Sequence, residues 1–223
     1  NYVHNVLAYT TNVAWRMSEL YLNAGIDVIA AVDPLVSQIS PEHFRKFLSK
    51  PYTRLFAIIR EARLKQEVFS SFFVCGNATN NIEPMCETAP DCISIDENVD
   101  IVKAKTITDR YNITIQGNIP LTTVMLFGNQ QDNMKYVVDL LDSLDHNNFI
   151  IAPGCDMPYA TPVENVVAVE QAVHQTATVR EMIKNYNAPE LEFHGELPDY
   201  DHLKKPLLEV FTLDSDTCAA CTY

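Results

Sequence analysis

Apolar and polar positions follow two alternating patterns along most of this chain. From residue 12 to 186, stretches with apolar residues three and four apart are followed by short continuous apolar runs. The first pattern is typical of amphipathic helices, and the second of buried parallel strands. The predicted helices are 12–22, 41–65, 82–88, 99–106, 132–143 and 162–186. The predicted strands are 27–32, 68–75, 92–95, 112–116 and 148–151. This alternation predicts an α/β fold with a parallel sheet wrapped by helices.

Capping residues support the predicted boundaries of the first two helices. Gly25 follows the first helix, at a position where glycine commonly ends helices. Ser40 precedes Pro41, and these residues suit the N-cap and the first turn of the second helix. Five strands are too few to close an eight-stranded barrel. The pattern therefore looks like a barrel that lacks its first strands.

The pattern changes after residue 186. Residues 187–205 are rich in Pro, Asp, Glu and His and are interpreted as a linker. Residues 206–223 contain a strand-like apolar run, 207–213, that leads to Cys218-Ala219-Ala220-Cys221. A strand followed by CxxC is how a thioredoxin-like domain begins, and it predicts a redox role for Cys218 and Cys221. Half of a zinc site and two idle thiols are the alternatives.

Composition narrows the classes of partner. Hydrophobic residues make up 47% of the 223 residues, yet no apolar run approaches the roughly 20 residues of a membrane span. A formal charge of −13 argues against nucleic-acid and anionic membrane surfaces as partners. The first residues show no secretory signal, so a cytoplasmic location is expected. There, six cysteines favour metal binding, redox chemistry or burial over a disulfide framework.

Several short motifs follow the predicted strands in a fixed order. They are Cys75-Gly76-Asn77, Ala89-Pro90-Asp91, Gln116-Gly117-Asn118-Ile119-Pro120, Pro153-Gly154-Cys155-Asp156 and Thr161-Pro162-Val163-Glu164-Asn165. With these motifs, residues 12–175 resemble the C-terminal half of the (β/α)8 barrel of the uroporphyrinogen decarboxylase superfamily. The resemblance implies that residues 1–186 supply roughly strands four to eight of a TIM barrel, followed by a C-terminal strand and CxxC segment.

Two cysteines resemble those of the superfamily branch that moves methyl groups to or from corrinoid proteins. Cys75 and Cys155 occupy motif positions that are zinc ligands in that branch, which implies a catalytic role for both. Both follow predicted strands, and the loops at that end of a barrel converge on one site. Two thiolates there would bind Zn²⁺ and leave open positions. The zinc would activate a methyl acceptor, or polarise a methyl ether for attack by Co(I).

One position departs from the methyltransferase pattern. Phe73 stands where thiol-methylating members have histidine, so a third zinc ligand has to come from elsewhere. Asp33 is the first candidate and Glu83 the second, and a residue of the N-terminal barrel half is a third option. The departure argues against coenzyme M as the methyl acceptor and favours demethylation of an ether or an amine.

Four further polar residues follow the predicted strands and are candidates for binding substrate. They are Asn77, Asp96, Asn118 and Asp156. Asn and Asp at such positions also cap helices and form Asx turns, so a structural role is an equal alternative for each.

The leading functional hypothesis is a zinc-assisted methyltransferase. It would exchange a methyl group between a small methylated substrate or acceptor and the cobalamin of a partner corrinoid protein. A uroporphyrinogen decarboxylase is the alternative enzyme, although that chemistry has no task for the two cysteines. A non-catalytic barrel subunit with a lost metal site is the alternative from another class.

Overall fold

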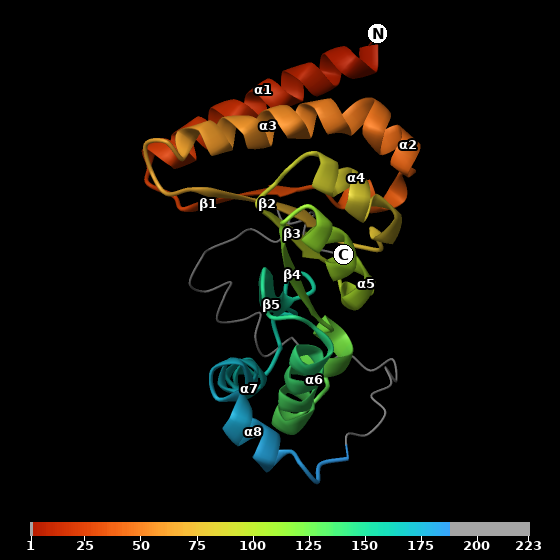
Figure 1. Ribbon diagram of the computed structural model, residues 1–223, viewed down its shortest axis with the longest axis vertical. Helices are drawn as coiled ribbons and strands as arrows, with labels where there is room; N and C mark the ends of the chain where they lie inside the picture. The colour runs from red at the N-terminus through yellow and green to blue at the C-terminus, as the bar shows by residue number, and fades with distance from the viewer. Residues whose placement is uncertain (1, 188–223) are drawn as a thin grey trace, which may run out of the picture. The chain divides into compact units, whose positions relative to one another are not determined.

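A five-stranded parallel sheet forms the centre of the chain in the computed structural model, which describes residues 2–187 (Figure 1). The strand order β1-β2-β3-β4-β5 follows the sequence, and all four pairings are parallel. The strands are β1 (Val28–Val32), β2 (Phe69–Val74), β3 (Cys92–Ile95), β4 (Thr114–Ile119) and β5 (Phe149–Pro153). The predicted α/β class with a parallel sheet is confirmed.

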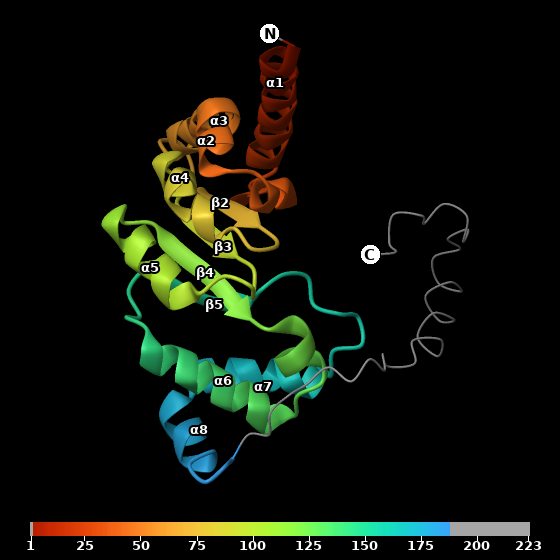
Figure 2. The same ribbon diagram turned by 90° about the vertical axis from the view of Figure 1, so that its right-hand side faces the viewer.

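Helices alternate with these strands along the chain. Figure 2 shows α3, α4 and α5 on one side of the sheet. The α-helices are α1 (Tyr2–Asn23), α2 (Pro41–His43), α3 (Ser49–Ala62), α4 (Ile82–Glu87), α5 (Ile101–Arg110), α6 (Gln130–Ser143), α7 (Val163–His174) and α8 (Thr176–Met182). Short 3-10 or π segments are η1 (Pro34–Gln38), η2 (Phe44–Leu48), η3 (Thr79–Asn81) and η4 (Leu121–Leu126).

The main hydrophobic core lies between the sheet and these helices. Successive strand side chains point to opposite faces, and Phe72, Ile93 and Ile115 point to the helix side, where all three are fully buried. The Phe72 ring packs on the Tyr52 ring of α3, with 4.3 Å between the ring centroids. The same ring also contacts Phe56 of α3. Aromatic packing therefore fixes α3 against β2.

The opposite face of the sheet is largely uncovered within the described residues. Val28 and Val32 of β1 are 53% and 58% exposed, Phe69 of β2 is 40% exposed, and Ile150 of β5 is 47% exposed. In a closed (β/α)8 barrel this face would be the interior, filled by side chains from all strands. Five consecutive parallel strands with one apolar face left open are consistent with a partial TIM barrel.

Several boundaries differ from the sequence-based prediction, three of them in ways that change the description of the elements. The first helix begins at Tyr2 instead of residue 12. The fourth strand begins at Thr114 instead of residue 112, because Asn112 adopts a positive φ of 53° and belongs to the turn that follows α5. The single helix predicted over 162–186 is two helices, since Gln175, with φ −126° and ψ 37°, leaves the helical region between α7 and α8.

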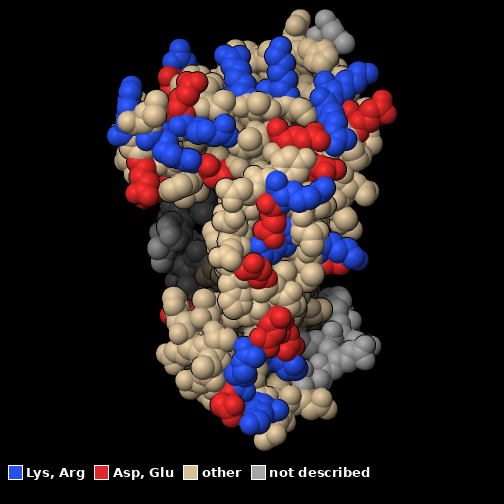
Figure 3. All heavy atoms as spheres, viewed as in Figure 1, with Lys and Arg blue, Asp and Glu red and all other residues tan. Residues whose placement is uncertain are grey.

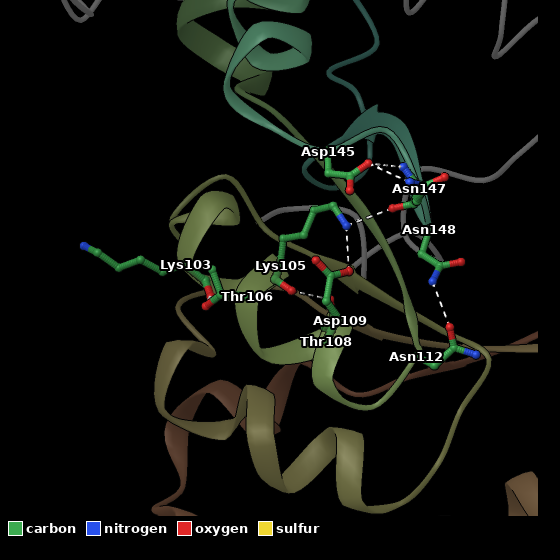
Figure 4. Close-up of polar contacts among 9 residues, drawn as sticks. All are labelled: Lys103, Lys105, Thr106, Thr108, Asp109, Asn112, Asp145, Asn147 and Asn148. Carbon is green, nitrogen blue, oxygen red and sulfur yellow. Dashed lines mark hydrogen bonds and ion pairs between the residues drawn. The ribbon is translucent and has the colours of Figure 1, made fainter.

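A buried lysine holds α5 to the loop before β5 (Figure 4). The Lys105 side chain is only 4% exposed. Its ammonium donates hydrogen bonds to Asp109 Oδ1 at 2.6 Å and to the carbonyl oxygen of Asn147 at 2.8 Å. The neighbouring Lys103 points away from this cluster. The contacts lie near the amino ends of β4 and β5, which in α/β barrels contribute to stability.

Within residues 2–187, none of the helices combines the length and the apolar character needed to cross a membrane. The predicted linker, 187–205, falls almost entirely outside the described residues. The predicted CxxC segment, with Cys218 and Cys221, lies wholly outside them.

Candidate metal centre at the strand ends

Cys75 and Cys155 meet at the carboxyl ends of the sheet. Cys75 directly follows β2, and Cys155 comes two residues after β5. Their Sγ atoms lie 2.8 Å apart, and both residues are free, partly exposed cysteines. The two cysteines chosen from the sequence motifs are thus brought together across a chain separation of 80 residues.

Two glycines let the loops carry these cysteines so close. Gly76 has a φ of +82°, and a Cβ atom there would lie 2.9 Å from Ser37 Oγ. A Cβ atom on Gly154 would lie 2.6 Å from the backbone nitrogen of Glu97. Only glycine fits such close approaches without displacing a neighbour. The sequence pattern of a cysteine beside a glycine therefore has a structural cause at both positions.

Asp96 fixes the turn that carries Cys75. This buried carboxylate accepts a hydrogen bond from the Gly76 backbone N–H through Oδ2 at 2.7 Å. Its Oδ1 accepts another from the Asn98 backbone N–H at 2.9 Å. Asp96 therefore links the end of β3 to the end of β2. These contacts position the turn, and substrate binding by Asp96 stays a prediction.

The electrostatic surroundings of the two thiols are acidic. The pKa of Cys75 is raised to about 12, first by partial burial and then by the hydrogen bond with Cys155 and the charges of Cys155, Asp96 and Asp156. At neutral pH the Cys75 thiol is therefore protonated in the absence of a cation. A bound cation would reverse this preference, because coordination stabilises thiolates.

The sulfur pair suits zinc in ligand type and supplies part of a site. Zn–S bonds of about 2.3 Å in a tetrahedral site place two sulfurs about 3.8 Å apart, so the thiols would have to separate by about 1 Å. Catalytic zinc usually has three protein ligands. Among residues 2–187, no three His, Cys, Asp or Glu side chains gather in a way that could hold a metal ion. The described residues thus gather two candidate ligands, Cys75 and Cys155.

Asp33, the first candidate for the third ligand, is not gathered with the two sulfurs. It follows β1, as predicted, but Tyr52 Oη donates a 2.6 Å hydrogen bond to Asp33 Oδ2. Asp33 Oδ1 accepts from the backbone N–H of Leu35 at 3.1 Å. Because the Tyr52 ring packs on the helix side of β2, this bond ties the carboxylate to that side. A ligand role for Asp33 stays a prediction that requires release from Tyr52.

Glu83, the second candidate, lies on an outer helix. Its Oε1 accepts a 3.0 Å hydrogen bond from Arg110, which joins α4 to α5. That contact is an ion pair between helices, and Glu83 belongs to no metal-binding group of the described residues.

The other predicted site residues are only partly gathered at the sulfurs. Asp156 is exposed next to Cys155, and its charge acts on Cys75. Asn77 Oδ1 accepts from the Thr79 backbone N–H at 3.2 Å, an Asx turn before η3. Asn118 is buried and its amide donates to the carbonyl oxygens of Asp96 and Val99 at 3.0 and 2.7 Å. The structural alternative thus describes the contacts of Asn77 and Asn118, and substrate binding by either stays a prediction.

Two residues near the strand ends were not singled out from the sequence. Tyr52 holds Asp33, and its pKa is raised by burial and by the hydrogen bond to that carboxylate. Glu97 accepts a short hydrogen bond from the Leu121 backbone N–H and touches Gly154. The available signal for Tyr52 was the pair Pro51-Tyr52, a further landmark of the resemblance to the uroporphyrinogen decarboxylase superfamily. Glu97 directly follows Asp96 at the end of a strand, which was the available signal for that residue.

A scan against protein families matches residues 1–176 to the model for "Uroporphyrinogen decarboxylase (URO-D)". The chain is 31% identical over 158 residues to the methylcobamide:CoM methyltransferase MtbA of Methanosarcina acetivorans, covering 70% of this chain and 43% of the relative. It is 28% identical over 164 residues to a uroporphyrinogen decarboxylase of Trichodesmium erythraeum, covering 74% and 45%. The chain spans less than half the length of these curated relatives.

The structural comparison supports the same fold. A methyltransferase from Methanosarcina mazei superimposes with a TM-score of 0.68 at 23% identity, covering 78% of this chain and 49% of that structure. At this identity the likeness shows the fold alone. It agrees with a chain that forms part of a larger α/β barrel.

Proposed function

We propose that this chain, which belongs to the uroporphyrinogen decarboxylase family, forms part of a zinc-assisted methyltransferase. The methyl group would pass between a small substrate and the cobalamin of a corrinoid protein. The observation that carries the proposal is the convergence of Cys75 and Cys155, whose sulfurs lie 2.8 Å apart at the carboxyl ends of the strands. Similarity to methylcobamide:CoM methyltransferases supports the direction of the chemistry.

The chemistry of the two thiols explains why a metal belongs there. Cys75 is held near carboxylates that oppose its ionisation, so two thiolates form only with a compensating cation. Thiolates are soft ligands that suit zinc. Bound zinc would act as a Lewis acid toward a thiol, ether or amine of the substrate.

Residues next to the two cysteines hold them in position. Asp96 holds the Gly76 turn, and Gly154 permits the close approach of the loop that bears Cys155. Phe73 belongs to β2 and lies two residues before Cys75, which directly follows that strand. Because Phe73 has an apolar ring where a histidine ligand would stand, the third zinc ligand would be Asp33 or a residue outside 2–187. The missing histidine also favours an ether or amine substrate over coenzyme M.

Uroporphyrinogen decarboxylases are also among the relatives, at similar identity and coverage. The paired cysteines favour methyl transfer over this alternative, because the decarboxylation chemistry employs no thiol pair.

Zinc content tests the proposal directly. After equilibration with zinc and gel filtration, the wild-type chain should retain about one zinc ion, and Cys75→Ser and Cys155→Ser should each lose most of it because each removes a thiolate ligand. Cys86→Ser is the matched control, since Cys86 is buried in the main core and away from the pair. Retention of wild-type zinc by both Cys75→Ser and Cys155→Ser would show that these residues are not the ligands.

A further inference from the structure

A cleft on the outer wall of the molecule lies between α1 and the η2–α3 segment. It has a volume of about 310 Å³ and an apolar floor that includes Leu7, Ala8, Phe47 and Pro51. Its remaining lining includes the three cationic residues Lys46, Lys50 and Arg54. No acidic residue lines it. The cleft is therefore a basic site in a chain whose net charge is −13.

The three cations have no ionic partner among the described residues. Residues 43–60 contain five Lys or Arg residues and no Asp or Glu. Two of these five are satisfied, because Arg45 pairs with Glu87 at 2.7 Å and Arg60 donates to the carbonyl oxygen of Ala89. Figure 3 shows Lys and Arg side chains gathered over the α1–α3 end of the face drawn.

Cations four residues apart on a helix repel one another where no anion compensates them. Among the described residues, the only partner of these three is the Phe47 ring, whose centroid lies 5.2 Å from the Lys46 ammonium. Lys46, Lys50 and Arg54 follow this spacing, and like charges at such positions destabilise a helix. A bound anion would remove the repulsion. The arrangement thus points to a negatively charged ligand, whose binding the apolar floor would strengthen.

The cleft lies beside the end of the sheet that carries the cysteines. Leu7, Thr11 and Pro51 line it and also line a neighbouring hollow of about 220 Å³ that reaches Asp33. Asp33 directly follows β1, and its backbone N–H donates to the Phe73 carbonyl oxygen, two residues before Cys75. A macromolecule bound in the cleft would therefore lie near the carboxyl ends of β1 and β2.

We propose that this cleft docks an acidic amphipathic helix of a partner protein, which, resting on the proposed function, is the corrinoid protein. The three cations recur about every 6 Å along the helix axis, the spacing of carboxylates at positions i, i+4 and i+8 of a second helix. The floor of Leu7, Ala8, Phe47 and Pro51 matches the apolar face of such a helix. Charge complementarity would also steer the partner toward the metal end of the sheet.

The test uses a fluorescein-labelled helical peptide of about 20 residues, with Glu at i, i+4 and i+8 beside a leucine stripe. The full chain should bind it, with affinity falling as NaCl rises. Lys50→Glu combined with Arg54→Glu should weaken binding by about tenfold or more. Lys65→Glu is the matched control, because Lys65 lies beyond the far end of α3 and lines a different hollow with Glu19 and Glu61. It should change affinity by less than about twofold.

Two outcomes would overturn the docking proposal. One is unchanged binding of the Glu peptide in the double variant, or equal binding of a matched peptide with Gln in place of Glu. The other is tighter binding of inorganic pyrophosphate than of the peptide, which would make the cleft a small-anion site. Zinc retention by the chain is assayed separately. Its absence would count against the proposed function while leaving charge-dependent peptide binding, and so the docking site, intact.

Discussion

Cys75 and Cys155 are partly exposed thiols whose sulfur atoms lie only 2.8 Å apart. Such a pair has two chemical options that exclude each other. A metal ion holds the sulfurs apart at roughly 3.8 Å, whereas a disulfide brings them to about 2.05 Å. The observed 2.8 Å lies between these distances, so small shifts of the two loops reach either state.

Oxidation of the metal-free pair is therefore expected. After chelation of zinc, oxidised glutathione should convert Cys75 and Cys155 into one disulfide and release two reduced glutathione molecules for this pair. The rate should rise with pH, because the raised pKa of Cys75, about 12, keeps the thiolate scarce at neutral pH.

Thiol titration and mass spectrometry measure this reaction, with the zinc-loaded chain as the protected control. If the metal-free pair gives only glutathione adducts, the sulfurs are not free to join.

The sequence predicted that Cys75 and Cys155 come together, and their sulfurs do meet. It did not predict the direction in which the Asp33 carboxylate points. A motif position beside glycine marks Cys75 and Cys155 because the close approach of the backbone requires the glycine. The direction of the Asp33 carboxylate depends on Tyr52, which comes from α3 and packs on Phe72. No local pattern around Asp33 encodes that contact.

Between strand and helix, two polar contacts hold the amino ends of the sheet. One joins Asp91, which precedes β3, to Arg63 after α3 at 2.6 Å and to the Ser70 backbone N–H at 2.8 Å. Burial acts to raise the pKa of Asp91, but the bonds from Arg63 and Ser70 lower it more, so the pKa lies below the ordinary 3.8.

Replacement of Asp91 by Asn should lower the free energy of unfolding by about 1–3 kcal/mol at pH 7. A carboxylate whose folded pKa is lowered stabilises the protein above its unfolded pKa, and this contribution is lost as pH falls through the folded pKa. The difference between the two proteins should therefore persist from pH 7 to about pH 4 and shrink below that.

Urea denaturation across this range measures the difference. Asp139→Asn, which alters an exposed pair with Lys135, is the control and should change stability by less than about 0.5 kcal/mol. A difference for Asp91→Asn that grows toward low pH would contradict the assigned ion pair.

The second contact is made by the buried Lys105, whose ammonium joins α5 to the loop before β5. Lys105→Met keeps the aliphatic stem but leaves the Asn147 carbonyl oxygen without this donor, so a loss of about 1–3 kcal/mol is expected. Lys103→Met, two residues away and 80% exposed, should change stability by less than about 0.5 kcal/mol. Thermal or urea unfolding measures the stability of both variants. Equal losses of stability would show that the buried Lys105 contributes no more than the exposed Lys103.

Element boundaries show where sequence periodicity was informative. The strand 92–95 was predicted as observed, since Pro90 and Asp96 bracket a short apolar run. The strand predicted at 112 begins two residues later because the left-handed Asn112 ends a turn. A second group of buried apolar residues, which includes Val137 of α6 and Ala168 of α7, also contains Val179 and Ile183. The break at Gln175 lets these two residues reach it, a tertiary effect that helical periodicity does not encode.

The whole molecule combines a well-packed helix side with an open sheet face. Each strand pairs in parallel with the next strand along the chain, and the alternation of elements predicted this parallel sheet. The number of strands also limits what the described residues can do. A barrel active site is built from loops after several strands, and the curated relatives are more than twice the matched length.

The exposed sheet face has a consequence for solubility. Among residues 2–187, β1 pairs with β2 alone, and its Val28 and Val32 are more than half exposed, so this part of the chain offers an aggregation-prone edge. The isolated 223-residue chain should self-associate with rising concentration, and Val28→Lys with Val32→Lys should reduce this by placing charge on the edge. Sedimentation velocity measures the effect, with Val163→Lys on α7 as an exposed control.

A monodisperse wild-type monomer at all concentrations would contradict the expected association. A polypeptide segment that pairs with the free edge of β1 and covers Val28 and Val32 should suppress aggregation as effectively as the lysine substitutions. Colloidal behaviour, measured before any assay of methyl transfer, would then report whether the sheet around the cysteine pair is closed.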